Sequence, residues 1–374
     1  MKLSACYIVK NEAASLPRSV ASLGDAIDEL VVVDTGSTDA TVAVAERLGA
    51  QVYPFAWQDD FAAARNAALD RAAGDWIFFI DADEFFATPL MRAEVEAYLR
   101  ACPAEALLLR RCNVNGPQQR RVDEDWTSLR VLRARPWLRY RGRVHEQLTD
   151  IRPGAAPLRP TRGPAAWLLL HTGYDAAIVK DKMVRNLRLL QQEIAAHGHQ
   201  PVYDFYLADC YFGLADYAAA ARAARAAIEG PVQMLGDGIH IYHMLLESLR
   251  QLGRREAQML AWADRAIAAY PAQPEFYAEK GMTLSALGRL PEARAQLIEA
   301  LLRYEQRAPG QAREGTYFGP MQAGLVAARL GEIMLRLHDV AEAQTWLTLA
   351  RRYAPEAPAV QRLQKNFAFS SAQA

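Results

Sequence analysis

The sequence predicts an α/β domain followed by an all-α domain, with the boundary near residue 175. Over roughly the first 84 residues, short apolar runs alternate with helical patterns. Such alternation is typical of a mostly parallel sheet covered by helices. Beyond about residue 176, alanine-rich amphipathic helices arrive in pairs. A chain of 374 residues is long enough for two domains of ordinary size, and we expect them at 1–175 and 176–374.

The α/β prediction rests on an ordered set of strand and helix candidates. Gly49 follows one helix candidate in the position of a glycine C-cap, which supports the end of that helix. The expected strands are 3–9, 30–33, 51–55, 76–80, 107–110 and 128–132, and the expected helices are 13–23, 41–48 and 61–72.

The all-α prediction rests on repeated helix pairs with similar turns. Gly253 and Gly288 lie in matching turns and are 35 residues apart, close to the period of about 34 residues expected of tetratricopeptide (TPR) repeats. The other spacings are looser, so the alternative is a plain helical bundle. The expected pairs are 203–214 with 216–229, 238–252 with 255–270, 274–287 with 291–304, and 321–337 with 340–353.

Composition excludes several classes of protein. Lys plus Arg and Asp plus Glu both number 43, so no global charge favours nucleic acid or an anionic membrane. The four cysteines show no C-x-x-C pairing, and reduced thiols in a cytosolic compartment are expected. No apolar run approaches the roughly 18 residues of a membrane-spanning helix. We expect a cytoplasmic protein that neither spans a membrane nor binds nucleic acid.

Two strand candidates end in aspartate. The run 31–33 leads into Asp34, and the apolar run 76–80 leads into Asp81-Ala82-Asp83-Glu84. Strands of a parallel sheet bring their carboxyl ends to one edge, where ligands gather. Carboxylates placed there cost stability unless a cation meets them, and the simplest partner is a divalent ion that also carries phosphate oxygens. The alternative is a solvated turn.

Further polar residues are expected at the same edge. Asn11 and Glu12 follow the first strand, and Asp60 precedes a helix that carries Arg65. Asp34 can accept hydrogen bonds from a ribose or a base, and Arg65 offers a guanidinium for phosphate or sugar hydroxyls. Neither G-x-G-x-x-G nor G-x-x-x-x-G-K-[ST] is present, so dinucleotide-binding and P-loop functions have no support.

These motifs, taken in order, resemble the family 2 glycosyltransferases of the GT-A (Rossmann-like) fold. The resemblance covers about the first 90 residues and rests on residues 11–12, 32–39, 64–66 and 80–84. Later motifs resemble one branch of that family, in which a TPR-like region follows the catalytic domain. They are residues 57–61, 143–148, 171–174 and 182–186.

The resemblance implies a nucleotide-sugar donor, usually a UDP-sugar, together with Mn²⁺ or Mg²⁺ and inversion at the anomeric carbon. Glu12 and Asp34 would then hold the nucleoside, and Asp83 would ligate the metal, with Asp81 on the ribose or the metal. His171 would complete the coordination; the alternative is a hydrogen-bonded structural histidine. Asn11, Asp60 and Arg65 are further candidates for the donor site.

Inversion by direct displacement also requires a base that takes the acceptor's proton. The acidic motif that many family members place after Asp-x-Asp is not obvious here. Glu146 is our first candidate, with Asp123, Glu124 and Asp125 as rivals, and a purely ion-paired Glu146 is the alternative. His145 is expected either to face the acceptor or to support its neighbours.

Two other functions are alternatives to a glycosyltransferase. A sugar nucleotidyltransferase would carry a glycine- and arginine-rich loop after the first strand, where this chain has Lys10-Asn11-Glu12. A non-catalytic repeat scaffold with a relic front domain is less consistent with the retained Asp34 and Asp83. The repeats offer a concave surface, which predicts a protein, peptide or glycan acceptor bound there.

Overall fold

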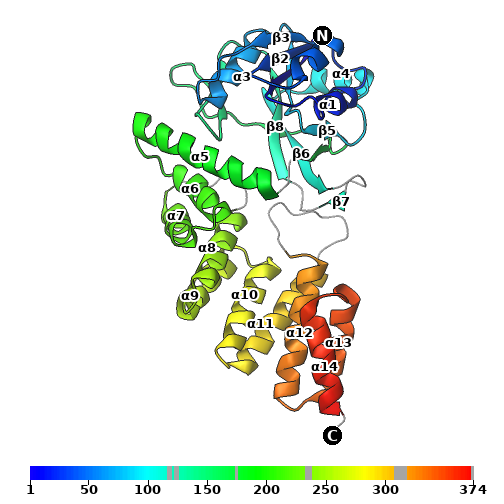
Figure 1. Cartoon of the computed structure of the whole chain (residues 1–374), viewed down its shortest axis with the longest axis vertical. Helices are drawn as coiled ribbons and strands as arrows, with labels where there is room; N and C mark the ends of the chain where they lie inside the picture. Colours follow the sequence, from blue (N-terminus) through cyan, green and yellow to red (C-terminus); the bar gives the residue numbers. More distant parts are fainter. Residues whose placement is uncertain (116–119, 122–125, 173–175, 232–237, 307–317, 372–374) are drawn as a thin grey trace. The chain divides into compact units, whose positions relative to one another are not determined.

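The computed structural model describes residues 1–374 except 116–119, 122–125, 173–175, 232–237, 307–317 and 372–374 (Figure 1). The chain forms two compact units, Met1–Gln200 and Pro201–Ala374. All four cysteines are buried and free. None of the described helices combines the length and the apolar character needed to cross a bilayer.

The first unit is built on a ten-stranded sheet and a separate β-hairpin. The strands are β1 (Leu3–Val9), β2 (Glu29–Asp34), β3 (Gln51–Pro54), β4 (Trp76–Phe79), β5 (Glu84–Phe86), β6 (Ala106–Asn115), β7 (Arg120–Arg121), β8 (Trp126–Arg133), β9 (Leu138–Arg141), β10 (Gln147–Asp150), β11 (Thr161–Arg162) and β12 (Leu169–His171). The order in the sheet is β3-β2-β1-β4-β8-β6-β12-β5, and β7 and β11 also pair with β6; β9 and β10 form the hairpin.

Strand direction decides which side chains meet at one edge. The strands β3, β2, β1 and β4 are parallel, as expected. The sheet is mixed beyond them, because β8 runs antiparallel to both β4 and β6. Since β12 is parallel to β6, the carboxyl ends of β1, β2, β4, β6 and β12 share one edge.

Helices cover both faces of this sheet, as the alternation of side chains requires. The helices α1 (Leu16–Ser22), α2 (Thr41–Arg47) and α4 (Arg92–Ala101) share a core with Tyr7 and Phe78. Helix α3 (Phe61–Leu69) packs on the other face with Cys6 and Phe79, and Figure 1 shows α3 and α1 on opposite sides of the strands. Gly49 has a φ of 83° after α2, which confirms the glycine C-cap.

Helix α5 (Ala176–His197) belongs to the first unit, although the sequence-based boundary at 175 assigns it to the second. Two ion pairs explain this placement. Arg188 on α5 pairs with Asp59, which precedes α3, and Glu193 pairs with Arg143, which follows β9. The change in composition near residue 176 therefore marks the start of helical sequence, whereas the compact unit ends one helix later.

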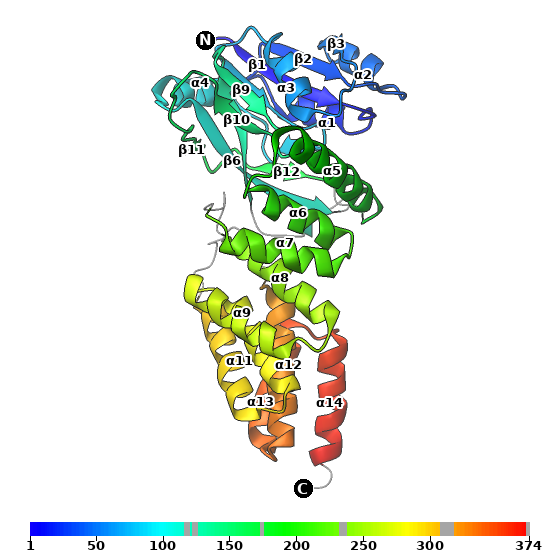
Figure 2. The ribbon, with the colours of Figure 1, turned by 90° about the vertical axis from the view of Figure 1, so that its left-hand side faces the viewer.

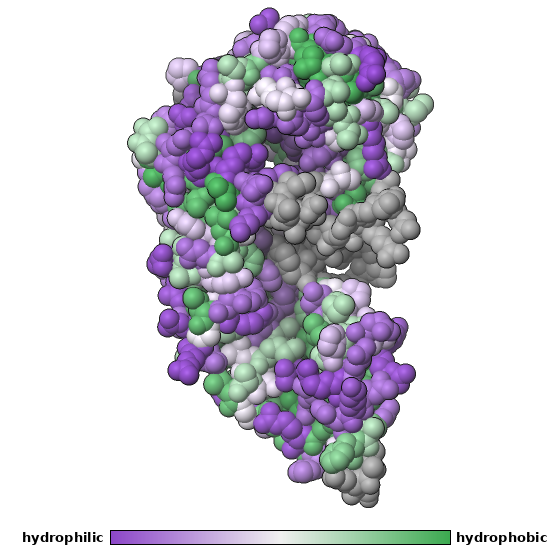
Figure 3. Space-filling model, viewed as in Figure 1, coloured by the Kyte–Doolittle hydropathy of each residue, from purple (hydrophilic) through white to green (hydrophobic). Residues whose placement is uncertain are grey.

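Among its described residues, the second unit contains all four expected helix pairs and one further helix (Figure 2). The pairs are α6 (Tyr203–Gly213) with α7 (Tyr217–Glu229), α8 (Ile239–Leu252) with α9 (Glu256–Ala269), α10 (Pro274–Ala286) with α11 (Leu290–Glu305), and α12 (Pro320–Arg336) with α13 (Val340–Tyr353). The last helix is α14 (Pro358–Ser371). On the face seen in Figure 3, hydrophilic side chains cover much of this unit, with smaller apolar patches between them.

Three of the four turns within the pairs share one backbone geometry, whereas the α8–α9 turn at Gly253 differs. His338 adopts a φ of 61° after α12, and the next amide, that of Asp339, donates to the Met334 carbonyl. This pattern is the Schellman motif, and it recurs after α6 and α10. The Asp339 carboxylate then caps α13 by accepting from the Glu342 amide. The similarity of the turns in the sequence therefore reflects a repeated structural unit.

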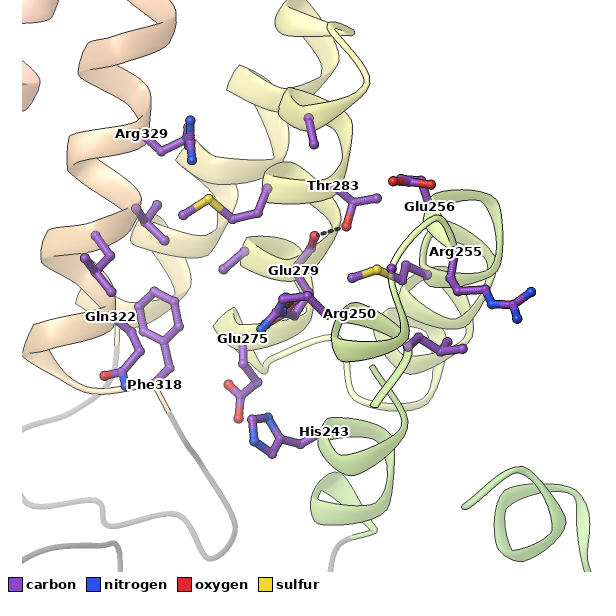
Figure 4. Close-up of a pocket in the computed structure, with 18 of the residues that line it drawn as sticks. His243, Arg250, Arg255, Glu256, Glu275, Glu279, Thr283, Phe318, Gln322 and Arg329 are labelled. Carbon is purple, nitrogen blue, oxygen red and sulfur yellow. Dashed lines mark hydrogen bonds and ion pairs between the residues drawn. The ribbon is translucent and has the colours of Figure 1, made fainter. Parts of the chain in front are cut away.

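A cavity of about 680 Å³ lies within the second unit, lined by residues of α8, α9, α10 and α12 and the segments beside them (Figure 4). Arg250, Glu279 and Arg329 contribute charged groups to its lining, and Arg250 pairs with Glu279. The apolar part of the lining includes Met259, Met282, Phe318, Leu325 and Val326.

Candidate active site

The loops after β1 and β2 are tied together at the carboxyl edge of the sheet. The Asn11 amide donates to Ser37 Oγ at 2.9 Å, and Asn11 Oδ1 accepts from the Thr38 amide at 2.8 Å. The Glu12 amide donates to Thr41 Oγ1 at 2.7 Å. Asn11 holds a φ of 59°, which non-glycine residues seldom adopt and which is common at functional sites.

Asp34 lies in the same pair of loops. It pairs with Val9 of β1, and its carboxylate accepts from the amides of Gly36 and Ser37 at 3.1–3.2 Å. Because Ser37 also contacts Asn11, the Asp34 carboxylate helps to shape the loop that faces the end of β1. Asp34 and Asn11 therefore come together, as the sequence predicts.

Helix α3 carries Arg65 into the core beneath this edge. Asp60 begins the helix by accepting from the Ala63 amide at 2.8 Å, so the structure gives Asp60 the role of an N-cap. The Arg65 guanidinium lies 4.6 Å from the centroid of the Phe79 ring and 5.4 Å from that of Tyr140. These cation–π contacts hold a side chain that is only 7% exposed.

Arg65 is part of a chain of alternating charges, which we call the arginine network. Arg65 Nη2 donates to Asp81 Oδ1 at 3.1 Å, and Arg130 Nη2 donates to Asp81 Oδ2 at 2.5 Å. Arg130 also binds Glu84 through Nε and Nη2, both at 2.7 Å. At the other end, Arg65 Nε donates to Glu146 at 2.5 Å. The network thus runs from Glu146 through Arg65, Asp81 and Arg130 to Glu84.

The arginine network supplies positive charge that the sequence interpretation assigned to a divalent ion. Glu84 is fully buried and Arg130 is 8% exposed, and charges placed so deeply need partners of opposite sign. Burial alone would raise the pKa of Asp81, but Arg130 and Arg65 more than offset this and hold it well below its usual range. Both Asp81 oxygens are therefore occupied by guanidinium groups.

Asp83 has a different environment. Its Oδ2 lies 3.0 Å from His171 Nε2, and His171 Nδ1 lies 2.7 Å from Asn113 Oδ1. The strands bring these residues together, because His171 on β12 pairs with Asn113 on β6. Burial opposes ionisation of Asp83, yet the hydrogen bond and charge of His171 outweigh it and lower the pKa. Lys182 Nζ of α5 lies 4.0 Å from the same Asp83 oxygen.

The donor set at Asp83 fits a divalent ion with few protein ligands. With Asn113 holding Nδ1, the ring orientation leaves Nε2 directed at Asp83, an arrangement usual for metal-binding histidines. Glu12 adds negative charge nearby: burial raises the pKa of its carboxyl, and the charges of Asp83 and Asp81 add to the effect. Within the described part of the chain, no group of three or more ligating side chains is preassembled.

Glu146 and His145 lie between β9 and β10. The Glu146 side chain is 13% exposed and faces Arg65, with which it pairs. Like Asn11, His145 is a non-glycine residue with left-handed backbone, at a φ of 54°. It directly precedes Glu146 of the arginine network. The rival bases Asp123, Glu124 and Asp125 lie outside the described residues.

The sequence patterns assign no individual role to Arg130, Lys182 or Arg185. Arg130 interrupts an apolar strand candidate, and a cation in such a run is a signal of a buried ion pair. Lys182 and Arg185 lie in a motif that supported the family resemblance, and their spacing of three residues predicts one side of a helix.

The arginine network predicts that replacing Asp81 lowers the stability of the fold more than replacing Asp83. Asp81→Asn leaves two guanidinium groups short of charge and should lower the free energy of unfolding by about 2 kcal/mol. This is below the 3–5 kcal/mol typical of a buried pair, because 32% of the Asp81 side chain is exposed. Asp83→Asn, measured by denaturant unfolding at pH 7, should cost about 1 kcal/mol or less. Equal losses of unfolding free energy in Asp81→Asn and Asp83→Asn would contradict the role of the arginine network in stability.

The loss of stability caused by Asp81→Asn should depend on pH, and the pKa of Asp81 determines the sign of this dependence. The pKa of Asp81 is lowered in the folded state, so its contribution is fully present above the unfolded-state value of about 4 and is lost as the pH falls below it. The stability difference between the wild-type protein and Asp81→Asn should therefore shrink in acid. A difference that grows below pH 4 would contradict this assignment.

Comparison with known proteins agrees with this geometry. The model of the family "Glycosyl transferase family 2" matches residues 4–154. A TPR repeat-containing protein of Synechococcus elongatus is 32% identical over 270 residues, covering 71% of this chain and 64% of its own length. An uncharacterized glycosyltransferase of Rickettsia felis is 46% identical over 83 residues, covering 22% of this chain and 29% of its own.

Among solved structures, YrrB, described as a TPR protein with an unusual peptide-binding site, aligns with 51% of this chain and 88% of its own, at 16% identity and a TM-score of 0.39. The chain spans less than two thirds of both curated relatives. Residues 4–154 belong to glycosyl transferase family 2, and the protein joins this domain to a C-terminal region of TPR-like helical repeats.

Proposed function

We propose that this protein is a metal-assisted, inverting glycosyltransferase that moves a sugar from a nucleotide-diphosphate sugar, a UDP-sugar, to a peptide or protein acceptor. The observation that carries the proposal is the pairing of Asp83 with His171 at 3.0 Å, on the edge that also holds Asp34 and Glu12. We place the reaction in the cytoplasm, where free buried cysteines such as these remain reduced.

The proposal assigns the nucleoside to the loops after β1 and β2. Asp34 and Asn11 shape these loops through hydrogen bonds to Ser37 and Thr38. The loops border the end of β1, and β1 pairs with β4, the strand that precedes Asp83. A nucleoside bound there would direct its diphosphate toward Asp83.

The proposal assigns the metal, Mn²⁺ or Mg²⁺, to Asp83 and His171. Bound there, the ion would act as a Lewis acid on the departing diphosphate. Two protein ligands leave coordination positions for phosphate oxygens and water, as is common for such ions. Asp81 then has a positioning role, because its two oxygens bind Arg65 and Arg130.

The proposal keeps Glu146 as the base. Its ion pair with Arg65 fixes the carboxylate between β9 and β10, and it is linked through Arg65 to Asp81. Arg65 thus connects the base to Asp81, two residues before the proposed metal ligand Asp83. Catalysis by direct displacement depends on such fixed geometry.

The proposal assigns the acceptor to the cavity of the second unit (Figure 4). Its lining includes the apolar residues Met259, Met282 and Leu325 beside charged Arg250 and Arg329. Flexible methionines suit varied apolar side chains, whereas glycans present mainly hydroxyl groups. The chemistry of the cavity therefore favours a peptide over a glycan acceptor.

The metal assignment is tested by nucleotide binding. UDP should raise the melting temperature much more in Mn²⁺ than in EDTA, and Asp83→Ala should abolish this difference because the ion loses its carboxylate. The control Asp70→Ala, which removes an exposed carboxylate at the end of α3, should respond like the wild-type protein. An unchanged response of Asp83→Ala to Mn²⁺ would contradict the assignment.

The base is tested by separating binding from transfer. Glu146→Gln keeps the size of the side chain and should leave UDP binding intact, while transfer falls by at least about 100-fold, the low end for loss of a general base. The rate is measured by mass spectrometry of the glycosylated acceptor. Near-normal transfer would move the role to another residue.

The acceptor assignment is tested with a peptide library and the donor together. Met282→Glu places a charge in the apolar lining and should reduce glycosylation of the library at least about 10-fold, while hydrolysis of the donor in the absence of acceptor stays unchanged. Leu337→Glu is the matched control, since Leu337 is 44% exposed and lies outside the cavity lining. Library glycosylation by Met282→Glu at the wild-type rate would exclude this cavity.

A further inference from the structure

We propose that Lys182 and Arg185 of α5 bind the diphosphate of the nucleotide donor and neutralise it as it leaves. This inference rests on the proposed function, since it concerns the same donor. It adds a helix outside the matched residues 4–154 to the donor site.

Helix α5 is fixed against the first unit with one side toward the site. Lys182, Arg185 and Arg188 are three residues apart and lie on neighbouring positions of the helix surface. Arg188 forms a two-point contact with Asp59 at 2.5 and 2.8 Å. Glu193, farther along the helix, pairs with Arg143. These contacts hold the cationic side of α5 in place, so the positions of Lys182 and Arg185 are structurally defined.

Lys182 lies beside the proposed metal position. Its Nζ is 4.0 Å from Asp83 Oδ2, and its side chain is 35% exposed. This distance is at the limit of an ion pair and longer than a hydrogen bond. Asp83 already binds His171 at 3.0 Å. A divalent ion on Asp83 would neutralise the carboxylate and leave the ammonium next to the phosphate oxygens that the ion carries.

Arg185 is a partly buried cation without a carboxylate partner at ion-pair distance among the described residues. Its guanidinium carbon lies 4.8 Å from the centroid of the Phe61 ring. Its Nε and Nη2 donate to the neutral amide oxygen of Asn186 at 3.2 and 2.9 Å. Burial lowers its pKa, and the more distant Glu146 only partly offsets this. A cation in this environment is costly unless an anion meets it.

Two cations beside the site remain available to an anionic ligand. Arg65 and Arg130 are matched by Asp81, Glu84 and Glu146, so they have no charge left for a ligand. Lys182 has only the 4.0 Å contact to Asp83, and Arg185 has no carboxylate at ion-pair distance among the described residues. A nucleoside diphosphate has the required charge, and arginine and lysine both bind phosphate well.

The reaction requires positive charge beside the diphosphate when the sugar is transferred. The bond between the anomeric carbon and the β-phosphate oxygen breaks, and its electron pair stays on that oxygen. The nucleophilic atom of the acceptor forms the new bond to carbon and loses its proton to the base. The departing diphosphate therefore gains one negative charge, and fixed cations next to it stabilise the transition state.

The test compares UDP with UMP by isothermal titration calorimetry in Mn²⁺ and in EDTA. Lys182→Gln and Arg185→Gln should each weaken UDP binding by about 10- to 100-fold, the effect of one charge-assisted hydrogen bond. UMP lacks the β-phosphate, so its affinity should change less than about threefold. Lys180→Gln is the matched control, because Lys180 is exposed on the same helix. Lys182→Arg should recover part of the lost UDP affinity.

Each outcome of the UDP and UMP titrations either supports or overturns the inference. Selective loss of UDP binding supports the inference. Wild-type UDP affinity in both glutamine variants overturns it, as does an equal loss of UDP and UMP, which would show that the residues only hold α5 in place. A wild-type protein that binds no nucleoside diphosphate would overturn the proposed function and this inference together.

Discussion

The site depends on the ion pairing of Asp81 with two buried guanidinium groups. Arg65 comes from α3, which packs on one face of the sheet, and Arg130 from β8, the strand next to β4, so the two contacts join a helix to the sheet. Neither arginine could remain charged at such depth without carboxylates, and their geometry fixes Glu146 and Glu84 as well. The network therefore sets the arrangement of the carboxyl edge before any ligand binds.

This constraint separates the two aspartates of the Asp-x-Asp motif. Asp81 and Asp83 both lie between β4 and β5, yet they meet different partners. Asp81 is occupied by arginines, whereas Asp83 faces an imidazole and a lysine. The division gives Asp81 to the arginine network, and the proposed function gives Asp83 to ligand binding. It also explains how three neighbouring carboxylates, including Glu84, coexist at one strand end.

Much of this was predictable from local patterns. The strand and helix alternation of the first 84 residues, the carboxyl edge with Asp34 and Asp83, and the helix pairs follow from periodicity and turn residues, which act over short distances. The arginine network did not follow, because Arg130 reaches Asp81 across 49 residues of chain, and pattern analysis carries no information on such pairing. The assignment of α5 to the first unit failed to emerge for the same reason, since Arg188 meets Asp59 across 129 residues.

The most direct test of this account is a crystal structure of the protein with Mn²⁺ and UDP, in which anomalous scattering locates the ion. The account predicts an ion bound by Asp83 and His171 and by the diphosphate, while Asp81 keeps both contacts to Arg65 and Arg130. An ion that takes Asp81 as a ligand, with either arginine released from it, would contradict the account.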